Sequence, residues 1–166
     1  MASMHVLSGT RAETGPHPAE THPSQSITPK GRFDRLPASL ASPAYLLLRV
    51  MAGILFAFHG LQGLSGYGIP AEYIPRFGSQ GWFGSVIELA TGLLMAGGLF
   101  TRWAAFLASG TMAVAYVQFH WKFQLGSRFF PALNQGEMAL VYSLVFLYFA
   151  ARGPGRMAVD NAIGRN

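Results

Sequence analysis

Four long apolar segments follow one another along the chain. They cover about residues 44–63, 82–100, 102–120 and 136–151. At 1.5 Å per residue, a helix needs roughly 20 apolar residues to cross the ~30 Å hydrocarbon core of a bilayer. The first three segments nearly reach that length, and the fourth reaches it with its flanking residues. The pattern predicts an all-α, polytopic membrane protein: a four-transmembrane-helix bundle that occupies residues 41–155.

The segments outside this bundle are polar. Residues 1–40 are rich in Pro, Ser, Thr, Gly and charge, and they lack the apolar stretch of a secretory signal peptide. Such a composition buries too little apolar surface to offset the entropy lost on ordering, so we predict a disordered cytoplasmic tail. Residues 156–166 are predicted to form a second, short cytoplasmic tail.

Charge is scarce in this chain and unevenly distributed. Charged residues make up 11% of the sequence, against roughly a quarter of an average soluble domain. Orientation in a bilayer explains the net charge of +5, because basic residues gather on the cytoplasmic side, and no nucleic-acid partner is expected. Both termini are then cytoplasmic, in a bacterial inner membrane. The basic residues on the cytoplasmic side include Lys30, Arg32, Arg35, Arg102, Arg152, Arg156 and Arg165, and those on the outer side are Arg76, Lys122 and Arg128.

The chemistry open to the chain is narrowed by the lack of cysteine. Dithiol exchange, thiolate-bound iron–sulfur clusters and cysteine zinc sites are excluded. Carboxylate and imidazole groups remain. Inside a membrane a carboxylate costs roughly 2.5–3.5 kcal/mol at a helix centre on insertion scales, so it points to function. Glu88 is the clearest case, because apolar residues flank it on both sides.

Four ionisable residues are predicted to converge in the outer third of the bundle. His59 and His120 lie near the outer ends of the first and third helices. Glu88 leans outward from the second helix, because helical side chains tilt toward their own amino terminus, and Glu137 begins the fourth. His59, Glu88, His120 and Glu137 are therefore the candidate catalytic or proton-relay residues. Glu137 has a competing interpretation, because Asn134 and Glu137 have the spacing of a capping box.

Small residues mark the faces on which the helices are expected to pack. Lipid gives apolar side chains no reason to prefer one another, so close approach of backbones must supply the contact. Gly53 and Gly60 lie on such a face of the first helix, and Gly92 lies on one of the second. Arg49 is expected to snorkel to the inner surface or to cap carbonyls of a neighbouring helix, and Arg102 to anchor the cytoplasmic side.

Taken in order, these residues resemble the DoxX family over about residues 45–160. The resemblance implies a four-helix inner-membrane protein, in a family named after a subunit linked to quinol oxidase and thiosulfate:quinone oxidoreductase activity. One departure is Gly63, which stands where many relatives place a Lys. The matching residues are Leu48-Arg49-Val50, Gly53, His59-Gly60, Glu88-Leu89, Gly92, Gly97-Gly98-Leu99-Phe100-Thr101-Arg102, Met112, Ala115, His120, Gly136-Glu137 and Gly153-Pro154-Gly155.

Three kinds of function fit these residues. The first is a membrane subunit of a redox system, whose outer His/Glu pocket binds a quinone or relays protons for a partner oxidoreductase, without an evident electron carrier of its own. In the second, His59 and His120 hold a b-type haem, or the four candidates hold a transition metal, although neither spacing is diagnostic. The third is a non-catalytic membrane scaffold. The sequence leaves the cofactor, the partner and homo-oligomerisation open, and we assign no metal site.

Overall fold

The computed structural model describes residues 38–164, and every regular element in that range is helical. The predicted all-α class is therefore confirmed. Most of the predicted tail over residues 1–40 lies outside the described residues. The elements are α1 (Ala41–Ser65), α2 (Gln80–Gly97), α3 (Thr101–Ala115), a π-helical segment (Tyr116–Trp121), α4 (Pro131–Asn134), α5 (Glu137–Arg152) and α6 (Val159–Ala162), with short 3-10 turns at Ala38–Leu40, Ala71–Tyr73 and Ser127–Phe129.

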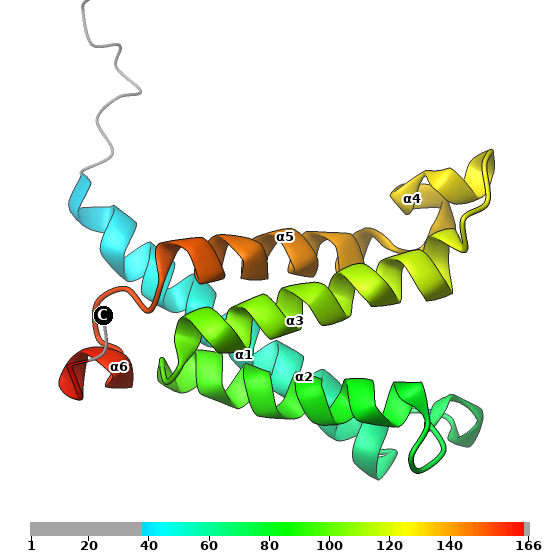
Figure 1. Cartoon of the computed structure of the whole chain (residues 1–166), viewed down its shortest axis with the longest axis horizontal. Helices are drawn as coiled ribbons and strands as arrows, with labels where there is room; N and C mark the ends of the chain where they lie inside the picture. The colour runs from blue at the N-terminus through cyan, green and yellow to red at the C-terminus, as the bar shows by residue number, and fades with distance from the viewer. Residues whose placement is uncertain (1–37, 165–166) are drawn as a thin grey trace, which may run out of the picture. The chain divides into compact units, whose positions relative to one another are not determined.

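The four long helices pack as two pairs. α1 lies along α2, and α3 lies along α5, while α2 and α3 meet next to the short connection that joins them. Figure 1 shows the two pairs separating toward the end that carries α4. Aromatic rings join the pairs near the opposite end, where Tyr45 meets Phe149 edge to face at 5.5 Å between centroids, and midway along the helices, where Phe56 meets Phe146 at 4.7 Å. The bundle is thus tightly closed at one end only.

Glycines allow α1 and α2 to approach at backbone distance. A Cβ added to Gly53 would lie 2.7 Å from the Gly92 carbonyl oxygen, and one added to Gly60 would lie 2.4 Å from the Leu89 nitrogen. At Gly92 the added carbon would lie 2.5 Å from the Ala57 nitrogen. All three contacts involve main-chain atoms, which cannot rotate away. The small-residue faces identified in the sequence are therefore the faces that meet.

The chain after α5 folds back onto the closed end of the bundle. Asp160 is 4% exposed, and its carboxylate accepts from the backbone nitrogens of Phe100 and Thr101 at 2.8 and 3.0 Å and from the Thr101 hydroxyl at 3.0 Å. Asp160 thereby caps the amino terminus of α3 from 59 residues away along the chain. The sequence predicted only a tail over residues 156–166, whereas the structure gives part of it a defined position.

Two arginines hold main-chain carbonyls at this same end. Arg49 is 1% exposed and donates to the carbonyl oxygens of Pro154 and Met157 at 2.9 and 3.2 Å. Arg102 donates to the last carbonyls of α5, those of Ala150 and Ala151, at 3.0 and 2.7 Å. A cation at a helix carboxyl end complements the helix dipole. Arg49 therefore does not snorkel, because its guanidinium is enclosed by the returning chain.

The segment around residue 135 differs from the predicted capping box. Asn134 ends the short helix α4, and its Oδ1 accepts from the Gly136 nitrogen at 2.7 Å. Gln135 takes a left-handed conformation, so Asn134 is separated from the start of α5, and the N-cap of α5 is Gly136 without a side-chain bond. The predicted capping box of Asn134 and Glu137 is therefore wrong. The third predicted helix also changes character, because its last turn is π-helical.

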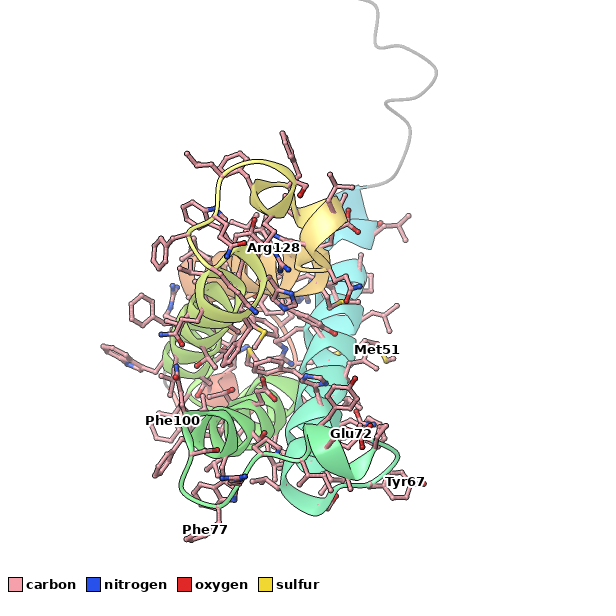
Figure 2. The ribbon with its side chains drawn as sticks, turned by 90° about the vertical axis from the view of Figure 1, so that its right-hand side faces the viewer. Met51, Tyr67, Glu72, Phe77, Phe100 and Arg128 are labelled. Carbon is pink, nitrogen blue, oxygen red and sulfur yellow. The ribbon has the colours of Figure 1, made fainter. Side chains whose placement is uncertain are left out.

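Large apolar side chains cover the outside of the long helices. Examples are Leu47 on α1 and Trp103 on α3, at 63% and 76% exposure, and Figure 2 shows Met51 projecting outward from α1. Among the described helices, α1 is long and apolar enough to cross a membrane by length and composition. Monomeric soluble proteins rarely expose apolar patches beyond a few hundred Å². The exterior is that of a membrane-associated protein.

Candidate functional site

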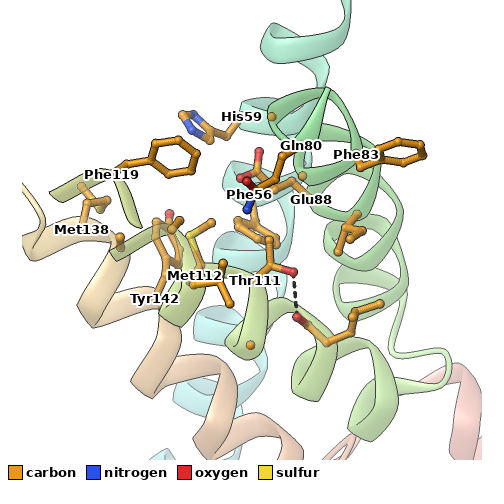
Figure 3. Close-up of a pocket in the computed structure, with 18 of the residues that line it drawn as sticks. Phe56, His59, Gln80, Phe83, Glu88, Thr111, Met112, Phe119, Met138 and Tyr142 are labelled. Atoms are coloured by element: carbon orange, nitrogen blue, oxygen red, sulfur yellow. Dashed lines mark hydrogen bonds between the residues drawn. The ribbon is translucent and has the colours of Figure 1, made fainter. Parts of the chain in front are cut away.

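A cavity of about 1050 Å³ lies where the two helix pairs separate. Pockets for small molecules typically measure about 300–1,000 Å³, so a ligand with a ring and part of a chain would fit. The lining is largely apolar, with polar groups at a few positions (Figure 3). It consists of Leu55, Phe56, His59, Gln62, Gln80, Gly81, Phe83, Gly84, Ile87, Glu88, Phe106, Leu107, Gly110, Thr111, Met112, Val114, Ala115, Phe119, His120, Gln135, Met138, Ala139 and Tyr142.

Glu88 is the buried acidic group of this cavity. It lies midway along α2, is 9% exposed, and makes no hydrogen bond or ion pair with any other residue that the structure describes. Arg49, the buried cation of the described chain, is bonded to carbonyls of the returning segment instead. A buried polar group without a partner is costly, by roughly 1–3 kcal/mol for a neutral group and more for a charge. Glu88 is thus available to a ligand in the cavity.

Two histidines share the cavity with Glu88. His59 is exposed and lines it from α1, and His120 is half-buried and lines it from the π-helical segment. The His120 Nδ1 lies 3.2 Å from the carbonyl oxygen of Asn134. A carbonyl can only accept, so this bond places the proton on Nδ1 and leaves Nε2 as an acceptor when the ring is neutral. The three residues from three elements therefore meet around one space.

Glu137, the fourth candidate, is not part of this cavity. It is exposed at the first turn of α5 and does not contribute to the lining. The next two residues of α5, Met138 and Ala139, line the cavity in its place. Within residues 38–164, no three His, Asp or Glu side chains come close enough together to hold a metal ion. The four-residue metal site considered from the sequence is therefore wrong.

Sequence reasoning missed the glutamines around the cavity. Gln62, Gln80 and Gln135 contribute to its lining, and the Gln80 side-chain amide donates to the Gln118 side chain (Figure 3 labels Gln80). This bond links the start of α2 with the π-helical segment across the separated ends of the pairs. Glutamine lies at helix ends for many reasons, so the sequence alone did not identify these residues as part of a site. It also did not predict the π-helical turn, although such turns occur frequently at functional sites.

The arrangement favours binding of a ring that carries hydrogen-bonding oxygens. Figure 3 shows Glu88 on the other side of the cavity from Met112 and Tyr142, with the His59 ring next to the Phe119 ring in this view. Aromatic and thioether side chains can pack on a ring, while a carboxyl group, an imidazole and amides can bond its polar atoms. The carboxyl and imidazole groups also exchange protons. The described residues of the cavity supply no evident carrier of electrons.

The fold and the cavity define a small, all-helical protein with an apolar exterior and an internal ligand space. The DoxX family model matches residues 44–121, from α1 to the π-helical segment. A protein of Haemophilus influenzae (strain Rd), described as uncharacterized, is 40% identical over 121 residues, which cover 69% of this chain and 86% of that protein. No solved structure matches the chain. The chain belongs to the DoxX family, which is membrane-associated and often linked to redox systems.

Proposed function

We propose that this protein is an integral inner-membrane subunit of a redox system, and that its cavity binds a quinone. In this proposal α1, α2, α3 with its π-helical extension, and α5 all cross the bilayer, and both termini are cytoplasmic. The support is that the outward faces of these helices are apolar, while the charged groups in their interiors, Arg49 and Glu88, are buried. Intramembrane charges almost always face the bundle interior or a cavity.

The observation that carries the proposal is the free Glu88 carboxyl group in an apolar cavity. A quinone presents two carbonyl oxygens on a flat apolar ring. A protonated Glu88 or an imidazole nitrogen can donate to such an oxygen, and the ring can lie against Phe119 or Tyr142. Reduction of a quinone to a quinol takes up two electrons and two protons. A partner oxidoreductase supplies the electrons in this proposal, and Glu88 with His59 passes the protons.

A b-type haem held by His59 and His120 is the second candidate. Both side chains line the cavity from different helix pairs, and the Nδ1 bond of His120 is of the kind that orients a haem or metal ligand. The exposure of His59 favours the quinone, because an axial ligand is normally held by packing and by a second bond. A haem absorption spectrum in protein purified from its native membrane would favour haem binding over quinone binding.

Equilibrium binding of an isoprenoid benzoquinone to the protein in lipid nanodiscs tests the proposal. Glu88→Gln keeps the volume but removes the exchangeable acidic proton. We expect the affinity for the quinone to fall about tenfold or more, because the variant loses one good hydrogen bond from an acidic or charged group. Glu137→Gln is the matched control, because Glu137 lies outside the cavity, and its affinity should match that of the wild type. Equal binding by wild type and Glu88→Gln would contradict the proposal.

A further inference from the structure

The cavity is polar toward one end and apolar toward the other. His59, Gln80 and His120 line it from helix parts remote from the connection between α2 and α3, and Glu88 lines it from the middle of α2. The lining nearest to that connection is provided by Phe106 and Leu107 of α3. The hydroxyl of Thr111, which lies on the same face, is already bonded to the Leu107 carbonyl at 2.9 Å. A ligand that fills the cavity therefore needs a polar head and an apolar body.

The cavity also opens sideways between α2 and α3. Phe83 of α2 and Phe106 and Val114 of α3 all line it, yet they are 56%, 61% and 46% exposed. Between these side chains lie two glycines, Gly84 and Gly110, and a Cβ added to either would meet no atom within 4 Å. These two glycines differ from Gly53 and Gly92, whose missing side chains are explained by helix contact. The α2–α3 seam is thus an opening between the two helices. Apolar side chains flank it, and the two glycines leave the helix surfaces between them without side chains.

We infer that the occupant is a membrane lipid with a long hydrocarbon chain, which enters through the seam between α2 and α3. This inference rests on the proposed function and names its substrate class: a quinone with an isoprenoid tail, and not a short or water-soluble quinone. The head lies between His59 and Glu88, and the tail passes over Gly84 and Gly110 into the surrounding acyl chains. A tail that stays in lipid keeps most of its conformational freedom, so its ordering costs little.

A seam-filling variant separates tail binding from head binding. Gly110→Leu adds a branched side chain to the seam at a position where an added Cβ would meet no atom within 4 Å. Gly97→Leu is the control, because an added Cβ at Gly97, the last residue of α2, also meets nothing within 4 Å, but Gly97 does not line the cavity. Gly84→Leu fills the seam from the other helix and replaces Gly110→Leu if that variant does not fold, as judged by circular dichroism.

Two benzoquinones with the same ring, one with a long isoprenoid tail and one with a methyl group, are titrated in nanodiscs. For each quinone, the apparent affinities of the variants are compared with one another. The partitioning of that quinone into lipid is then the same in every measurement and cancels. We expect Gly110→Leu to weaken binding of the tailed quinone about tenfold or more, as for an overpacked site, and to leave the methyl quinone within about threefold. Gly97→Leu should change neither.

Each other outcome identifies what has failed. If both quinones bind and Gly110→Leu affects neither or both equally, the seam does not hold the tail, so the inference is overturned while the proposed function stands. If neither quinone binds to the wild type, the proposed function fails, and this inference fails with it. An effect of Gly97→Leu equal to that of Gly110→Leu would mean that helix loosening, and not the filled seam, causes the loss.

Discussion

Removing the Asp160 carboxylate should destabilise the bundle far more than a surface change near the carboxyl terminus normally does. The group accepts hydrogen bonds at 2.8 to 3.0 Å from the backbone nitrogen of Phe100, which precedes α3, and from the backbone nitrogen and hydroxyl of Thr101, its first residue, and it is 4% exposed. Loss of an N-cap side chain costs about 0.5–2 kcal/mol. A hydrogen bond to a charged group adds about 1.5–3 kcal/mol, and the terms do not simply add. Asp160→Ala should therefore lower the free energy of unfolding by about 2–4 kcal/mol.

Unfolding by SDS in mixed micelles, followed by far-UV circular dichroism, measures this loss. Asn161→Ala is the control, because the Asn161 side chain is exposed and donates one hydrogen bond, to the Gly155 carbonyl at 2.7 Å. We expect it to lower the free energy of unfolding by about 1 kcal/mol or less. Hydrogen exchange at the Phe100 and Thr101 amides should rise in Asp160→Ala, because both lose their acceptor. If stability and amide exchange both stay at wild-type values, the returning segment does not cap α3, and the reasoning is refuted.

Two further predictions concern packing and orientation. Gly92→Ala should destabilise the bundle by about 1–3 kcal/mol, because the new carbon meets main-chain atoms of α1, whereas Gly97→Ala should be neutral or slightly stabilising in the same SDS titration. Equal effects of the two changes would contradict the close approach of α1 and α2. An alkaline phosphatase fused after Asn166 should be inactive and one inserted near Gly126 active, because basic residues favour the cytoplasmic side, and the reverse pattern would overturn the proposed orientation.

The sequence was most informative where a short-range rule decides the structure. Small-residue spacing identified the packing faces of α1 and α2 that carry Gly53 and Gly92, but the structure shows that these two faces meet each other. The helix rise per residue and the side-chain tilt predicted that His59, Glu88 and His120 lie together in the outer third of the bundle. In the structure all three line one cavity. These rules depend only on helix geometry, which the long apolar segments already impose.

Long-range and irregular features were beyond such rules. Asp160 reaches the start of α3 because of a turn after α5, and no periodicity links the two positions. Glu137 was wrongly grouped with the cavity residues, because the turn at Gln135 could not be foreseen. At Gly63, a Cβ would lie 2.1 Å from the Ser85 hydroxyl oxygen, so any larger residue there would require Ser85 to move, which the sequence pattern did not reveal.

Photolabelling with an azido derivative of a long-tailed quinone tests most directly whether the cavity is a quinone site. The label is activated on wild-type protein in nanodiscs, and the modified residues are mapped by mass spectrometry. We expect modification within 55–62, 80–88 and 106–120, suppressed by excess unlabelled quinone and strongly reduced in Glu88→Gln. Labelling spread over lipid-facing positions such as Trp103, insensitive to competitor and unchanged in Glu88→Gln, would contradict the account.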